Sequence, residues 1–109
     1  MARVKEKVAI VTGGARGIGK STCKVLAAEG AKTAVTDIIE DEGEEVAEEI
    51  RQNGGEAEFW HLDTADESAV SNVFQQVKDR FGTLDILVNN AGISGTNAPT
   101  HEISQAAWQ

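Results

Sequence analysis

The sequence predicts an α/β domain built around a doubly wound parallel sheet. Short apolar runs that suit buried strands alternate with stretches of helical spacing, and glycines stand where most of the helices should end. The predicted order is three strand–helix units followed by a fourth strand, with short connections. Strands in this order pair in parallel through right-handed crossovers, so we expect one domain over residues 1–109.

The first strand–helix unit contains the most informative stretch of the chain. Four consecutive apolar residues, Val8 to Val11, predict a strand buried on both faces. A glycine-rich turn follows, and a helical pattern opens at Gly17 and continues to Glu29, with Gly30 placed as a left-handed C-cap. A strand that passes through glycines into a helix leaves backbone N–H groups at the helix N-terminus. These groups form an anion site suited to a pyrophosphate.

The same alternation continues beyond this unit. The expected elements are a strand over Lys32–Asp37, a helix over 41–53, a strand over 57–63, a helix opened by a capping box over 64–67 and closed by Gly82, and a strand over 84–89. The third helix has the clearest signal, because positions 70, 73, 74, 77 and 81 are apolar. From Asn90 the sequence becomes loop-like, and Ser104 would cap a last helix.

Charge and composition exclude several classes of partner. Eighteen acidic residues against ten basic ones give a net charge of −8, which disfavours nucleic acid and anionic membranes. Many of the acids fall in the helix over 41–53, where we expect a solvated face. Because no apolar stretch suits a membrane span or a signal peptide, we expect a cytoplasmic protein. The single cysteine, Cys23, excludes an internal disulfide and a multi-cysteine metal site, and indicates a buried thiol.

The glycine turn after the first strand fits more than one phosphate-binding pattern. Gly14 to Gly19, followed by Lys20 and Ser21, has the spacing of a P-loop. The turns of dinucleotide-binding domains and of S-adenosylmethionine methyltransferases are also rich in glycine. The aspartates that end the second and third predicted strands fit a dinucleotide site better than the magnesium site of a P-loop protein.

Three motifs on the expected elements resemble the short-chain dehydrogenase/reductase family. They are the turn Thr12-Gly13-x-x-x-Gly17-Ile18-Gly19, the pair Asp63-Thr64 after the third strand, and Asn89-Asn90-Ala91-Gly92 after the fourth. The resemblance covers nearly the whole chain and implies a Rossmann-type sheet with strand order 3-2-1-4. It also implies an oxidoreductase that transfers a hydride between a nicotinamide dinucleotide and a small alcohol or ketone. The fourth-strand motif argues against a methyltransferase.

The resemblance implies a cofactor site at these motifs. Its residues would be Gly13, Arg16, Gly17, Ile18, Gly19, Asp37, Ile38, Asp63, Thr64, Asn90, Ala91 and Gly92. The first glycines would let the backbone approach the pyrophosphate, and Gly19 would let the first helix pack closely on the sheet. Asp63 would accept a hydrogen bond from the adenine amino group. Asn90 would either contact the ligand or pin the fourth strand to its neighbours through its amide.

The choice between NAD and NADP depends on two opposing charges. Asp37 follows the glycine turn at the spacing expected for the acid that binds a ribose diol. It would repel a 2′-phosphate by about 4 kcal/mol for each pair of unit charges at ~4 Å and an effective dielectric constant of about 20. Arg16 favours NADP instead, because a basic residue before the middle glycine is a phosphate partner in NADP-preferring members of the family. We expect NAD, with NADP the less favoured cofactor.

The residues that catalyse hydride transfer in the family cannot be assigned in this sequence. The family uses a tyrosine, a lysine, a serine and an asparagine, and this chain contains no tyrosine. We therefore expect an incomplete, truncated half-domain that binds the cofactor and is inactive alone, or else a non-catalytic dinucleotide-binding module. In the expected strand order the apolar strand over 84–89 lies at the sheet edge, which predicts homo-oligomerisation or association through that strand.

Overall fold

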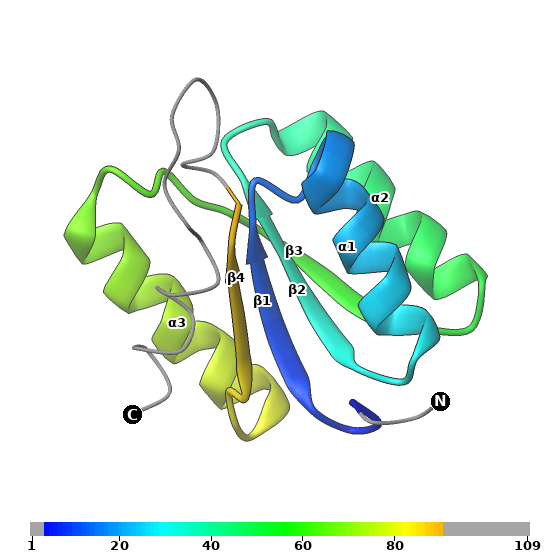
Figure 1. Ribbon diagram of the computed structural model, residues 1–109. Helices are drawn as coiled ribbons and strands as arrows, with labels where there is room; N and C mark the ends of the chain where they lie inside the picture. The colour runs from blue at the N-terminus through cyan, green and yellow to red at the C-terminus, as the bar shows by residue number, and fades with distance from the viewer. Residues whose placement is uncertain (1–3, 91–109) are drawn as a thin grey trace.

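The computed structural model describes residues 4–90, which form a parallel sheet with helices on both faces (Figure 1). The elements are β1 (Val8–Thr12), α1 (Gly17–Ala28), β2 (Lys32–Asp37), α2 (Glu40–Gln52), β3 (Glu56–His61), α3 (Glu67–Phe81) and β4 (Ile86–Asn89). The strand order β3-β2-β1-β4 confirms the predicted order. Figure 1 shows α1 and α2 on one face of the sheet and α3 on the other.

The sheet separates two apolar layers, because successive side chains of a strand point to opposite faces. Val11 of β1 packs in a cluster with Cys23 of α1 and Val46 of α2. Its neighbour Ile10 belongs to the opposite cluster, which includes Val77 of α3. All five residues of β1 are buried, as expected for the central strand of a sheet covered on both faces.

Helices α1 and α2 end at glycines, as the sequence predicts for both. Gly30 and Gly54 have φ angles of 98° and 90°, in the left-handed region that favours glycine. In α1 the N–H of Ala31 donates to the carbonyl of Leu26 at 3.0 Å, so the turn satisfies one of the carbonyls left open at the helix end.

The start of α3 differs from the sequence prediction. A capping box led by Thr64 is wrong, because Asp66 is the N-cap and its carboxylate accepts the Ala69 N–H at 3.1 Å. Thr64 lies in a turn that Asp63 closes by accepting the Ala65 N–H at 2.9 Å. Thr64 is therefore part of the turn before α3 and does not cap the helix, which begins at Glu67.

The two edge strands are shorter than the sequence predicts. β3 ends at His61 instead of residue 63, and β4 begins at Ile86 instead of residue 84. Ahead of β4, Asp85 pairs with β1 through both its backbone and its side chain. Its Oδ2 accepts the Val8 N–H at 2.9 Å, and its own N–H donates to the Val8 carbonyl at 2.8 Å.

Within residues 4–90, β3 and β4 form the edges of the sheet. Leu87 is the one buried residue of β4, and its other residues are half-buried. Association through this strand stays a prediction. No helix in this part of the chain is long and apolar enough to cross a membrane.

Candidate functional site

The predicted site residues within 4–90 lie where the four strands end, at the carboxyl edge of the sheet. This edge is where ligands bind in open α/β sheets. The described ones are Gly13, Arg16, Gly17, Ile18 and Gly19 after β1, Asp37 and Ile38 at the end of β2, Asp63 and Thr64 beyond β3, and Asn90 after β4. Ala91 and Gly92 lie outside the described residues.

The turn after β1 places the N-terminus of α1 at this edge. Gly13 has a φ of 65° and Gly17 a φ of 55°, so two residues of the turn adopt the left-handed conformation. Arg16 is the N-cap of α1, and its side chain makes no capping hydrogen bond. A Cβ at Gly17 would meet no atom of the described residues within 4 Å, so among these residues nothing covers the backbone there. The first N–H groups of α1 are thus available to an anion.

At Gly19, helix α1 lies in close contact with the turn after β1. A Cβ at this position would overlap the Gly13 carbonyl oxygen and would lie 2.6 Å from Nδ2 of Asn90. The same Nδ2 donates to the Gly13 carbonyl at 3.2 Å. The helix, the turn and the loop after β4 therefore meet at one point, and only glycine leaves room for that contact.

The Asp37 carboxylate is held in place by two backbone N–H groups. Oδ2 accepts the N–H of Ala15 at 3.0 Å, and Oδ1 accepts the N–H of Ile39 at 3.0 Å. These bonds tie the turn after β1 to the end of β2. An ionised carboxylate has about four acceptor positions, so each oxygen keeps capacity for a further donor such as a hydroxyl.

Arg16 and Glu42 form an ion pair across the same edge. Nε of Arg16 lies 2.6 Å from Oε1 of Glu42, and Nη2 lies 2.8 Å from Oε2. The hydrogen bond from Arg16 lowers the pKa of Glu42, and the Glu42 carboxylate in turn raises the pKa of Arg16. The sequence prediction placed Glu42 on a solvated acidic face and missed this pair. No spacing rule could have found it, because the partners are joined only by the fold.

The ends of β1 and β4 are tied together by a short chain of hydrogen bonds. The hydroxyl of Thr12 donates to Oδ1 of Asn89 at 3.0 Å and accepts the N–H of Asn90 at 2.9 Å. With its amide on Gly13, Asn90 anchors the loop after β4 to the loop after β1. This is the strand-pinning contact expected for Asn90, while its role toward a ligand stays a prediction.

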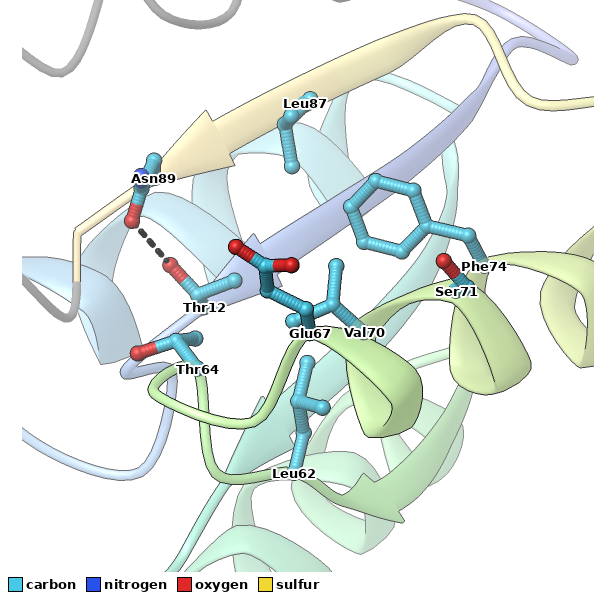
Figure 2. Close-up of a pocket in the computed structure, with 9 residues that line it drawn as sticks. All are labelled: Thr12, Leu62, Thr64, Glu67, Val70, Ser71, Phe74, Leu87 and Asn89. Carbon is cyan, nitrogen blue, oxygen red and sulfur yellow. Dashed lines mark hydrogen bonds between the residues drawn. The ribbon is translucent and has the colours of Figure 1, made fainter.

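A cleft of about 460 Å³ opens between α3 and the carboxyl ends of β1 and β4 (Figure 2). Its lining consists of Thr12, Leu62, Thr64, Glu67, Val70, Ser71, Phe74, Leu87 and Asn89. Figure 2 shows the Glu67 carboxylate between the Thr12 side chain and the Phe74 ring, with Thr64 on the loop that leads into α3. Of the predicted site residues that the structure describes, only Thr64 lines this cleft. The sequence predicts the α3 residues of this lining only as helix positions, because their spacing indicates no chemistry.

Cys23 lies directly beneath the β1 turn. Its side chain is fully buried, and a Cβ on Gly14 would lie 3.0 Å from its Sγ. Burial, with a smaller contribution from the Asp37 charge, raises the pKa of the Cys23 thiol to about 12. The buried thiol predicted from the sequence is confirmed.

We expect the native chain to resist thiol-specific reagents at pH 8. The reactive thiolate is almost absent four units below the pKa, and the reagent reaches Sγ only when the turn and α1 open. The measurement is the release of chromophore from a disulfide reagent, with the same chain in urea as the fully reactive control. Immediate stoichiometric labelling of the folded chain would show that the thiol is accessible.

Comparison with known proteins assigns the family. The family model for short chain dehydrogenases matches residues 7–109, so the chain belongs to the short-chain dehydrogenase family. Members of this family typically bind a nicotinamide dinucleotide. The assignment favours the dinucleotide interpretation of the glycine turn over the P-loop and methyltransferase interpretations.

Individual relatives support the assignment over most of this chain. It is 47% identical over 102 residues to the uncharacterized oxidoreductase YxbG of Bacillus subtilis, covering 94% of this chain and 37% of YxbG. It is 42% identical over 108 residues to the cyclopentanol dehydrogenase of a Comamonas species, covering 99% of this chain and 43% of that enzyme. The crystal structure of a hydroxysteroid dehydrogenase from Escherichia coli superposes with a TM-score of 0.82 and 36% identity, covering 96% and 46% of the two chains. The chain thus spans less than half the length of these relatives.

Proposed function

We propose that this chain is the cofactor-binding part of an oxidoreductase that transfers a hydride between NAD and a small alcohol or ketone. The observation that carries the proposal is the Asp37 carboxylate, held by two backbone N–H groups beside the N-terminus of α1. A dinucleotide needs both features together, one for a ribose diol and one for the pyrophosphate. Bound nicotinamide would supply the hydride chemistry, and this chain would bind and orient the cofactor.

The residues at the carboxyl edge fit the parts of a dinucleotide. The open backbone at Gly17 leaves space for the pyrophosphate against the first N–H groups of α1. Ile18 and Ile38 expose 69% and 61% of their surface at this edge, although apolar side chains of this size are usually buried. We propose that the adenosine and nicotinamide portions cover them, with Asp63 and Asn90 as polar contacts.

The charges around Asp37 favour NAD over NADP. A 2′-phosphate carries up to about two negative charges and would meet the fixed Asp37 carboxylate. Arg16, the one basic side chain predicted to attract that phosphate, is already paired with Glu42. Neutral ribose hydroxyls encounter no such repulsion.

The relatives suggest the substrate class. The names of two of them specify cyclopentanol and a hydroxysteroid, both of which carry a hydroxyl group. We propose an alcohol or the corresponding ketone as the substrate of the protein. This chain contains no tyrosine, so we expect it to bind the cofactor without turnover of its own.

Fluorescence titration with NADH, NADPH and S-adenosylmethionine tests the proposal. We expect NADH to bind more tightly than NADPH and S-adenosylmethionine not to bind. Asp37→Asn should reduce the preference for NADH by about tenfold or more, because it removes the charge that repels the phosphate. Asp79→Asn makes the same change of charge on exposed α3 and should leave the preference unchanged. Equal affinity of the unchanged chain for both dinucleotides would contradict the NAD assignment.

A further inference from the structure

Arg16 and Glu42 lie at the N-terminal ends of the two helices that follow β1 and β2. Arg16 is the N-cap of α1, and Glu42 is in the first turn of α2, which begins shortly after β2. The Asp37 carboxylate accepts the N–H of Ala15, the residue before Arg16 in the chain. Glu42, and to a smaller extent the Asp37 charge, raise the pKa of Arg16.

The guanidinium of Arg16 is engaged in the geometry that phosphate recognition requires. Arginine binds carboxylates and phosphates through two parallel N–H donors. In Arg16 two such donors, on Nε and Nη2, point at the two oxygens of Glu42. A 2′-phosphate that bound through this edge of the side chain would have to displace Glu42.

We propose that Glu42 is a specificity-determining residue, which disfavours NADP by holding Arg16 away from the 2′ position of the ribose. This inference rests on the proposed dinucleotide function. Glu42 touches neither reacting atoms nor, in this proposal, the cofactor, so it is a positioning residue that acts through Arg16. Asp37 repels the phosphate directly, whereas Glu42 withdraws the cation that would attract it.

The effect is moderate because the pair is exposed. The Arg16 and Glu42 side chains expose 66% and 40% of their surface. Ion pairs with this exposure are weak, and a phosphate could break this one at little cost. We therefore expect Glu42 to adjust the preference that Asp37 sets, and not to replace it.

Binding of NADH and NADPH to the full chain and to Glu42→Gln tests the proposal. Glu42→Gln should tighten NADPH binding by about fivefold and change NADH binding much less, because only NADPH carries a phosphate for the released Arg16. Glu44→Gln is the matched control, since it removes the same charge from an exposed position of α2. It should alter neither affinity.

Combination with Arg16→Ala separates the two ways in which Glu42 could act. In the Arg16→Ala background, Glu42→Gln should no longer tighten NADPH binding. A gain that persists without Arg16 would show that Glu42 repels the phosphate directly and would overturn the proposal, as would an unchanged NADPH affinity in Glu42→Gln itself. If the unchanged chain binds no dinucleotide at all, the proposed function fails and this inference fails with it. NADH binding without an effect of Glu42 would contradict this inference alone.

Discussion

Gly19→Ala is expected to destabilise the domain by about 3 kcal/mol and to abolish tight dinucleotide binding. The added Cβ overlaps the Gly13 carbonyl, a backbone atom that cannot move without shifting the whole turn. Alanine is favoured over glycine in a helix by about 1 kcal/mol, so the steric overlap outweighs a gain of opposite sign. Because the displaced turn is the proposed pyrophosphate site, binding is lost as well as stability. Urea unfolding and NADH titration measure the two effects.

Gly55→Ala is the matched control for this experiment. It adds the same methyl group just before the amino end of β3, away from the proposed site. A Cβ there would lie 2.8 Å from the side chain of Ile50. A side chain can adjust more easily than a carbonyl in a tight turn. We expect a smaller loss of stability and unchanged NADH binding. Normal NADH affinity in Gly19→Ala would show that the turn tolerates the methyl group.

Asp85→Ala is expected to lower the free energy of unfolding by about 1–3 kcal/mol. The substitution removes the acceptor of the Val8 N–H, and Val8 is completely buried at the start of the central strand. A buried donor left without a partner loses its hydration and gains nothing in return. Asp85→Asn keeps an oxygen at this position and should retain most of the stability. Urea unfolding of both variants measures the difference, and equal stabilities for alanine and asparagine would rule out the hydrogen bond as its cause.

The order and type of the elements could be predicted because each depends on neighbouring residues. The apolar run from Val8, the spacing of the α3 residues and the stops at Gly30 and Gly54 are all local patterns. The positions of the glycine turn and Asp37 follow from the same order, since parallel strands place their carboxyl ends at one edge.

The contacts between distant segments, at the candidate site and elsewhere in the sheet, could not be predicted. Asp85 reaches Val8 and Arg16 reaches Glu42 only because the folded sheet brings distant segments together. An acid before a strand or in the first turn of a helix is common, and nothing local distinguishes these two from other surface acids. Around Thr64 the sequence allows either a capping box or a turn followed by an Asp66 N-cap. The geometry of the turn before α3 decides between them.

The hydrogen bonds of Asp37 have a consequence for how the cofactor preference of such a chain can change during evolution. Because its carboxylate fastens two loops as well as facing the proposed ribose position, a substitution there alters stability and selectivity together. Glu42 carries no such structural duty toward the core, since its contact with Arg16 is exposed. A change from the proposed NAD preference toward NADP would therefore start more readily at Glu42, with Asp37 replaced only after stability has been gained elsewhere.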